Sequence, residues 1–266
     1  MSKLIAHSAF FVLACAAVAC GGSPPPAAST PATPTAPSTP APEPASGKVD
    51  STPIADPVAN VPPTCKNGTK AADAGLIDDL EDGNVLAATQ GGRTGSWWIG
   101  KADHATISIP AGGTAKPSAG EAPGSKFAMH FAGKTDNSDP WGAAVGVNFL
   151  SSGAFYDASK YAGIAFKIKS AKPNLDVRLK INDVNTHPDG GQCKKECFNA
   201  FGRELILGTE PRDVSLMWSE LTQQSDWGNP RPPMIDPTKL KDIEWQVWPG
   251  VDFDIWIDDV HFIACQ

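Results

Sequence analysis

Hydrophobic and polar residues alternate along residues 251–262 (VDFDIWIDDVHF). The apolar positions of one parity are Val251, Phe253, Ile255 and Ile257, and acidic residues and a tryptophan take the other parity. A period of two predicts a β-strand with one side in a core and the other in solvent. Such a strand needs partners. Residues 76–84 (LIDDLEDGN) form a second apolar and acidic segment, and we predict that the two segments meet and close a β-sandwich.

The same alternation recurs at short intervals along the chain. Strands are predicted at residues 106–109, 126–131, 141–150, 163–169, 175–183, 204–207, 212–216 and 243–248. Clusters of Gly, Pro, Asn and Asp separate them. No long helical period occurs, and residues 218–223 would form one turn at most. The pattern predicts an all-β fold, a two-sheet antiparallel β-sandwich of the jelly-roll type.

The N-terminal part has a different composition. Residues 1–19 have the features of an export signal, with Lys3 followed by an apolar run that is too short to span a membrane permanently. The sequence Ala17-Val18-Ala19-Cys20 resembles a bacterial lipobox, which implies that Cys20 carries the lipid anchor of an outer-membrane lipoprotein, either periplasmic or at the cell surface. A plain cleaved signal peptide is the alternative.

A proline-rich segment follows the signal. Residues 22–63 hold 13 of the 25 prolines, with Ala, Ser and Thr between them. This composition cannot bury enough apolar surface to fold and predicts an extended spacer. We therefore divide the chain into a lipoprotein signal peptide (1–19), a disordered linker (20–63) and one folded module (64–266).

Charge and cysteine content narrow the chemistry of the module. The net charge of the chain is −7, without a Lys/Arg run, so a nucleic-acid partner is not expected. In an exported protein, four module cysteines permit two disulfides in three connectivities. We predict the pair Cys193–Cys197, which closes a small loop, and the pair Cys65–Cys265, which flanks the module. A metal site is the alternative, although Cys-x-x-Cys spacing and nearby histidines are lacking.

The order of several segments carries a resemblance. These segments are LIDDLEDG, DPWGAAVGVNF, YDASKYAGIAFKIKS, DVRLKI, DVSLMWSEL, PTKLKDIEWQV and FDIWIDDVHF. The series is similar to galactose-binding-like jelly-roll carbohydrate-binding modules, family 11 of bacterial cellulases in particular. The resemblance implies a glycan cleft on a concave sheet and a structural Ca²⁺ where the first and last strands meet. Residues 185–201 (NTHPDGGQCKKECFNAF) have no counterpart in that family.

The resemblance assigns the calcium ligands. Glu81 and Asp258 match the family's positions, and Asp79 and Asp259 are further candidates. Calcium prefers several oxygen ligands, and carboxylates brought together without a cation would repel each other. The alternative is that these acids cap turns and solvate strand ends.

Outward-facing residues of the predicted strands supply candidates for the cleft. Aromatic rings stack on the apolar faces of sugars, and polar side chains bind the hydroxyl groups. The candidates are Trp98, Trp141, Arg178, Lys180, Glu244, Gln246 and Trp248. Trp97 is also placed near a turn, and the small residues Ala144 and Gly146 would leave room for a ligand above them. Arg178 and Lys180 could also suit acidic or phosphorylated glycans.

These observations predict a monomeric, non-catalytic module that binds a β-glucan-like polysaccharide. A jelly-roll glycoside hydrolase is one alternative, but the Glu-x-Asp-x-x-Glu pattern of sandwich glucanases is lacking, as are other catalytic motifs. An adhesive or protein-interaction module without glycan binding is another alternative.

Overall fold

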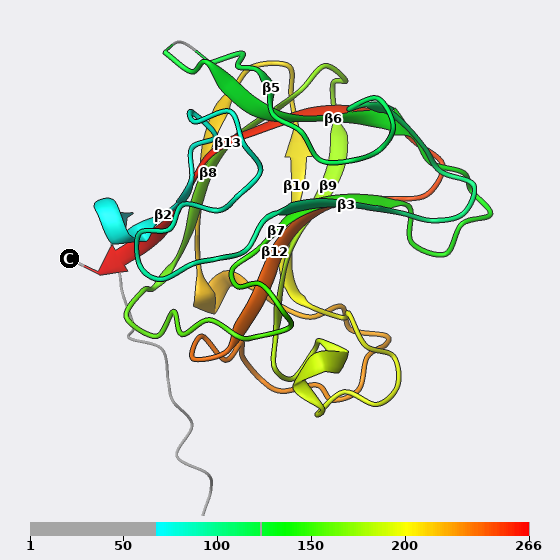
Figure 1. The fold of residues 1–266 in the computed structure, drawn as a ribbon. Helices are drawn as coiled ribbons and strands as arrows, with labels where there is room; N and C mark the ends of the chain where they lie inside the picture. The colour runs from blue at the N-terminus through cyan, green and yellow to red at the C-terminus, as the bar shows by residue number, and fades with distance from the viewer. Residues whose placement is uncertain (1–67, 123, 266) are drawn as a thin grey trace, which may run out of the picture. The chain divides into compact units, whose positions relative to one another are not determined.

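The computed structural model describes residues 68–122 and 124–265 (Figure 1). The predicted signal peptide, the linker, Cys20 and Cys65 lie outside the described residues, so the predictions about them stay predictions. In the described part, no helix is long and apolar enough to cross a membrane.

Two antiparallel sheets make up the module. The larger sheet has the order β11 (Arg212–Met217), β8 (Gly163–Ser170), β13 (Asp252–Cys265), β6 (Phe127–Lys134) and β4 (Thr106–Ile109), with β1 (Gly68–Lys70) and β2 (Leu76–Asp78) on β13 and β5 (Ser118–Ala119) on β6. The smaller sheet has the order β10 (Phe201–Leu207), β9 (Leu175–Asp183), β12 (Leu240–Val247), β7 (Ala143–Asn148) and β3 (Trp97–Lys101).

Helical structure in the described residues is limited to three short 3-10 turns. They are η1 (Asp73–Gly75), η2 (Pro188–Gly190) and η3 (Trp218–Glu220). Figure 1 shows β6 and β13 in one layer and β3, β7 and β12 in the other. The predicted all-β, two-sheet antiparallel sandwich is therefore confirmed.

The pairing of the first and last segments of the module is also confirmed. On β13, Val260 lies opposite Asp78 of β2. The same strand pairs with β1, β6 and β8, so it lies at the centre of the larger sheet. Its alternation is realised in burial, because Phe253, Ile255 and Ile257 are all buried between the sheets.

Aromatic side chains join the two layers. The rings of Phe166, on β8, and Trp245, on β12, meet edge to face with their centroids 5.2 Å apart. Full burial of one such ring contributes about 2 kcal/mol, and Trp245 is completely buried. The period of two then directs its neighbours Glu244 and Gln246 to the opposite face of β12.

The position of Trp97 corrects one expectation. Residues 97–101 form β3, a strand that the alternation did not predict. Trp97 stacks on Trp245 in the core, with centroids 5.7 Å apart, and its indole N–H donates to Asp78 Oδ2 at 2.7 Å. Trp97 is therefore not a cleft residue, whereas the next residue, Trp98, faces the other side of the sheet.

The disulfides agree with the prediction as far as they are described. Cys193 and Cys197 are bonded to each other. Cys265 is also disulfide-bonded, but Cys65 lies outside the described residues, so the pair Cys65–Cys265 stays a prediction.

Candidate binding cleft

The outer face of the smaller sheet brings distant residues into one row. Trp98 on β3 lies opposite Gly146 on β7, Gly146 opposite Glu244 on β12, and Glu244 opposite Lys180 on β9. Three strand spacings of about 4.8 Å span about 14 Å across this row. The sheet register therefore builds a continuous floor from four strands.

Two glycines make room for indole rings on this floor. A methyl group at position 146 would approach Trp98 Cζ2 to 2.6 Å. A methyl group at position 100 would lie 3.3 Å from both Trp98 Cζ3 and Trp141 Cη2. Trp98 therefore lies over Gly146, and the space above this glycine holds a protein ring rather than a ligand, contrary to the expectation from its small size.

A buried ion pair lies at the centre of the floor. Lys180 Nζ is 2.5 Å from Glu244 Oε1, and both residues are less than one-tenth exposed. The contact is a close ion pair without the angles of a good hydrogen bond. The two charges compensate each other on the floor, and neither would be stable there alone.

Asp242 extends this network along β12. Burial raises the pKa of Asp242 to about 7, and the nearby charge of Glu244 raises it as well. The Asn182 amide, which donates to Asp242 Oδ1 at 2.9 Å, acts in the opposite direction. Asp242 therefore favours its protonated form more than an ordinary aspartic acid does, which limits the negative charge on this part of the outer face.

Arg178 shares the outer face with Lys180 but does not line the cleft. Its guanidinium donates to Glu204 Oε1 at 2.8 Å and to the Thr222 carbonyl at 2.7 Å. These bonds direct the side chain toward β10 and the segment beside it, because Thr222 pairs with Gly202 of that strand. Arg178 thus stabilises this edge of the sheet.

Loops at both ends of the strands deepen the floor into a cleft of about 740 Å³. Its lining residues are Trp98, Pro140, Trp141, Lys180, Cys197, Phe198, Gln224, Trp227, Glu244, Gln246 and Trp248. Six of the seven predicted binding residues, all except Arg178, therefore lie around one space. The volume falls within the range of about 300–1,000 Å³ that is typical of ligand sites.

Five lining residues were not predicted, because they belong to loops without alternation. They are Pro140, Cys197, Phe198, Gln224 and Trp227. A weak signal existed for Trp227, a tryptophan in the Gly- and Pro-rich run DWGNPRPP. No comparable signal existed for Phe198, because its position depends on how two loops pack together.

The predicted calcium ligands have protein partners. Glu81 Oε1 accepts from the Lys126 backbone N–H at 2.8 Å, and Asp79 Oδ1 accepts from the Glu81 N–H at 3.2 Å. Asp259 Oδ2 lies 2.7 Å from Lys167 Nζ. Among residues 68–122 and 124–265, no group of three or more His, Cys, Asp or Glu side chains is placed to hold a metal ion.

The four carboxylates thus do not form one donor set in this arrangement. Ca²⁺ binding by Asp79, Glu81, Asp258 and Asp259 stays a prediction from the resemblance. Melting with and without EGTA, together with elemental analysis, would test it.

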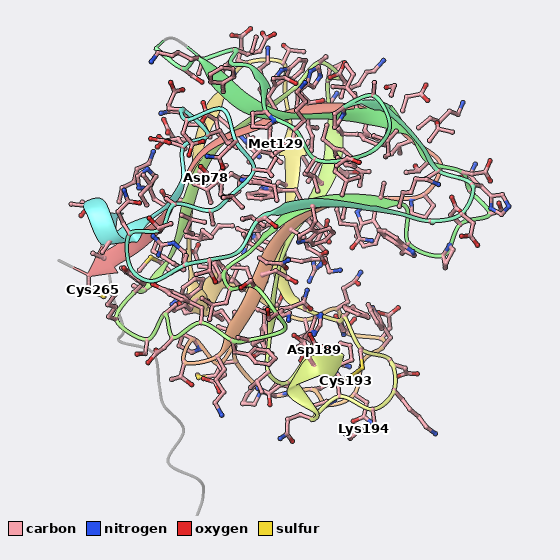
Figure 2. The ribbon with its side chains drawn as sticks, in the orientation of Figure 1. Asp78, Met129, Asp189, Cys193, Lys194 and Cys265 are labelled. Carbon is pink, nitrogen blue, oxygen red and sulfur yellow. A yellow bond between two sulfur atoms is a disulfide. The ribbon has the colours of Figure 1, made fainter. Side chains whose placement is uncertain are left out.

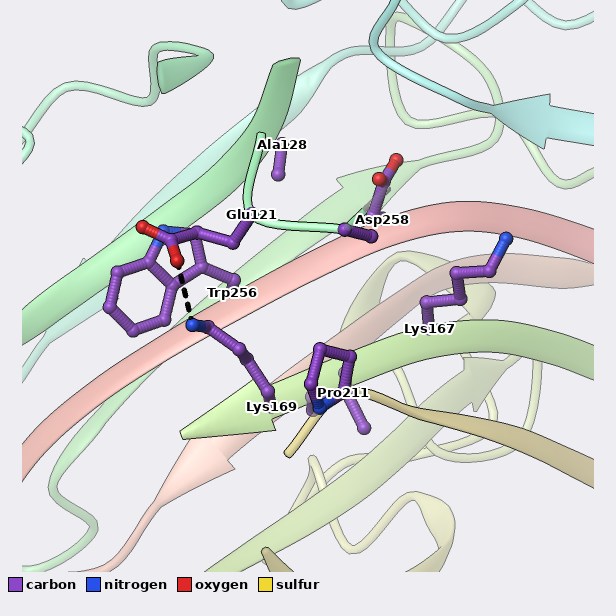
Figure 3. Close-up of a pocket in the computed structure, with 9 residues that line it drawn as sticks. Glu121, Ala128, Lys167, Lys169, Pro211, Trp256 and Asp258 are labelled. Carbon is purple, nitrogen blue, oxygen red and sulfur yellow. Dashed lines mark hydrogen bonds and ion pairs between the residues drawn. The ribbon is translucent and has the colours of Figure 1, made fainter. Parts of the chain in front are cut away.

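Asp258 lies instead beside a small cavity on the outer face of the larger sheet (Figure 3). The cavity measures about 20 Å³, which is room for about one water molecule. The Trp256 ring stacks on His130 with a centroid separation of 3.9 Å and carries Lys169 Nζ 4.4 Å from its centroid. Protein groups already contact this ring, so the cavity is not a sugar site.

Comparison with solved structures finds carbohydrate-binding modules to which this chain is similar. The chain is similar to a family 11 carbohydrate-binding module of the cellulosomal cellulase Lic26A-Cel5E of Clostridium thermocellum, with a TM-score of 0.48 and 15% identity over 75% of this chain and 95% of that chain. A family 11 module from the same organism in complex with a β-1,3-1,4-mixed-linked tetrasaccharide gives a TM-score of 0.44 and 15% identity over 64% of this chain and 89% of that chain. A family 30 module of the cellulosomal cellulase Cel9D-Cel44B of C. thermocellum gives a TM-score of 0.46 and 13% identity over 71% of this chain and 97% of that chain.

The sequence itself matches no family model and no curated protein. Family 11 modules, which the segment order resembles, are among the structures that this comparison finds. The identities and TM-scores of these similarities are low, and a function has to be inferred from the cleft itself.

Proposed function

We propose that this protein binds a polysaccharide in the cleft of its smaller sheet without catalysing a reaction. The observation that carries the proposal is the convergence of Trp98, Trp141 and Trp248 around one cleft with a polar floor. Aromatic rings contact the C–H faces of pyranose rings, and polar side chains at fixed positions bind the hydroxyls. Gln246 is held for such a role, because its amide donates to the Trp141 carbonyl at 2.6 Å.

The charge balance of the floor supports a neutral glycan, of the β-glucan type, as the ligand. Lys180 is paired with Glu244, and Arg178 with Glu204. Paired cations attract an acidic ligand much less than free ones, because the partner carboxylate cancels most of their field. This pairing argues against the acidic or phosphorylated glycans that Arg178 and Lys180 could have suited.

The composition of the cleft also supports binding rather than hydrolysis. Glycoside hydrolases need two carboxyl groups, one on each side of the scissile bond. Of the described residues that line the cleft, Glu244 alone is acidic, and its carboxylate is held by Lys180. A jelly-roll hydrolase is therefore the less favoured function.

We further propose that the module is monomeric and is tethered by a lipid on Cys20 through the linker of residues 20–63, at the outer membrane. The lipobox-like sequence and the proline content support the tether. Metabolic labelling with a radioactive fatty acid would test it, because the label should be lost in Cys20→Ala.

Affinity electrophoresis tests the binding function. The chain should be retarded in gels that contain mixed-linkage β-glucan and should migrate normally in gels that contain polygalacturonate. Incubation with the same glucan should release no new reducing ends. Unchanged mobility across a broad panel of neutral glycans would contradict the proposal and favour a protein-interaction module.

A further inference from the structure

Phe198 is an exposed aromatic ring on the cleft. Its exposed fraction is 46%. The other exposed large apolar side chains in the described residues are Leu86, Ile206 and Met234, none of which lines the cleft. Exposing a phenylalanine loses the free energy that its burial would give. A ring held at the surface in this way is therefore a candidate for contact with a ligand.

The backbone around this ring is held in an unfavourable conformation. Phe198 has φ 71° and Glu196 has φ 53°, in the left-handed region that bulky residues rarely adopt. Conformations of this kind are unfavourable and persist only where the surroundings enforce them. The Cys193–Cys197 disulfide ends directly before Phe198, so the covalent loop is part of that enforcement.

Further contacts fix the ring from behind. The Phe198 N–H donates to the Thr186 carbonyl at 2.8 Å. The His187 ring meets the Phe198 ring edge to face, with centroids 5.3 Å apart. These contacts belong to the β9–β10 loop, where Figure 2 shows Cys193 near Asp189. The ring is thus positioned from its own loop rather than by packing into the core.

Asn199, the next residue, ties this loop to the β11–β12 loop. Its side chain accepts from the Gln224 N–H at 2.9 Å and donates to the Trp227 carbonyl. The Trp227 indole N–H in turn donates to Gln224 Oε1 at 2.9 Å. The two loops, which lie together at the bottom of Figure 1, therefore form one wall that carries both Phe198 and Trp227.

We propose that Phe198 and Trp227 form an additional sugar subsite, held in place by the Cys193–Cys197 loop. The inference rests on the proposed function and extends it. The two rings line the same cleft as Trp98 and Trp248, so a polysaccharide lying on the floor reaches them with a further pyranose. Trp227 already satisfies its N–H within the wall, which leaves its ring to contact the apolar face of a sugar.

Calorimetry with neutral β-glucan oligosaccharides of increasing length, on the full chain, tests the subsite. Wild-type affinity should rise with length until the wall is reached. Phe198→Ala and Trp227→Ala should lose at least fivefold in affinity for the long oligosaccharides and little for the shortest one that binds. Leu86→Ala is the matched control and should bind like the wild type. Leu86 is 57% exposed and does not line the cleft.

Conservative variants separate contact from folding. Phe198→Tyr should keep the affinity, whereas Phe198→Leu should lose it while melting within a few degrees of the wild type. The double variant Cys193→Ser/Cys197→Ser should show the same length-dependent loss. Undiminished binding in both Phe198→Ala and Trp227→Ala at every length would overturn the subsite alone. Absence of binding by the wild type to any of these glycans would overturn the proposed function, and the subsite with it.

Discussion

Lys180 and Glu244 face each other across β9 and β12, with Nζ 2.5 Å from Oε1 and both side chains about one-tenth exposed. A buried charge that loses its partner keeps the desolvation cost without the attraction. We expect Lys180→Met to lower the free energy of unfolding by about 3 kcal/mol, measured by urea denaturation at pH 7.

The double variant Lys180→Met/Glu244→Met provides the control for this prediction. It should recover most of the loss, because two apolar side chains replace two charges. If the loss of stability in the double variant equalled the sum of the losses in the two single variants, the assignment of a coupled pair would be contradicted.

Gly146 allows Trp98 to lie across the floor. The methyl group of Gly146→Ala would also meet the Ile243 carbonyl at 2.7 Å, so both the ring and the strand must shift. We expect a loss of about 2 kcal/mol in stability and a loss of at least tenfold in glycan affinity. Gly208→Ala is the control, because nothing lies within 4 Å of that position. Equal behaviour of the two variants in melting and calorimetry would argue against this packing.

The raised pKa of Asp242 predicts a pH dependence of stability. The folded state favours the protonated acid, so the stabilising effect is complete below about pH 4, the ordinary pKa, and is lost as the pH rises to about 7. Asp242→Asn should therefore match the wild type at pH 4 and exceed it at pH 8 by about 2 kcal/mol, measured by denaturant melts.

In Asp242→Asn, the free energy of unfolding should still fall as the pH rises, but less steeply than in the wild type. Burial also raises the pKa values of Asp78, to about 6, and of Asp183 and Asp258, in which desolvation is the largest cause. A variant that is less stable than the wild type at pH 8 would contradict the raised pKa.

The contribution of Asp259 to stability should depend on pH in the opposite direction to that of Asp242. His261, Lys167 and Lys70 hold the pKa of this carboxyl well below its usual range. Asp259→Asn should lower stability at pH 7 by about 1 kcal/mol, because the carboxylate and its lysine partners are partly exposed. The difference should shrink as the pH falls below about 4, the ordinary pKa, because the unfolded chain then takes up a proton at this carboxyl group while the folded protein does not.

The Asp259→Asn substitution is compatible with the local backbone and has a matched control. Asparagine tolerates the left-handed backbone at this position, where φ is 55°. Asp213→Asn is the control, because Asp213 is exposed and lies 3.9 Å from Lys70. EGTA in the buffer excludes any metal contribution. Equal melting temperatures of the two variants at pH 7 would contradict the stabilising role of Asp259.

Alternation identified the strands whose apolar and polar side chains face opposite sides of a sheet. It placed β9 at residues 175–183, as the structure has it, and set Lys180, Glu244 and Gln246 on the outer face. It missed β3, because Trp97 and Trp98 are both aromatic and five residues give little periodicity. Which of the two indoles faced the core was decided by tertiary packing against Trp245.

The walls of the cleft could not be predicted from local pattern. Phe198 and Trp227 are brought together by bonds of Asn199 to a loop 25 residues later. Arg178 was placed on the correct face, but its bonds to Glu204 and Thr222 draw it away from the cleft. The order of the sequence segments was enough to predict the fold, whereas the shape of the site depends on contacts between loops.

Calorimetry of the Trp98→Ala/Trp248→Ala double variant against a neutral β-glucan oligosaccharide that the wild type binds tests the central claim most directly. We expect a loss of at least tenfold in affinity, about 1.4 kcal/mol or more, while thermal unfolding of the variant remains cooperative. Affinity equal to that of the wild type would show that the glycan binds elsewhere and would contradict the cleft.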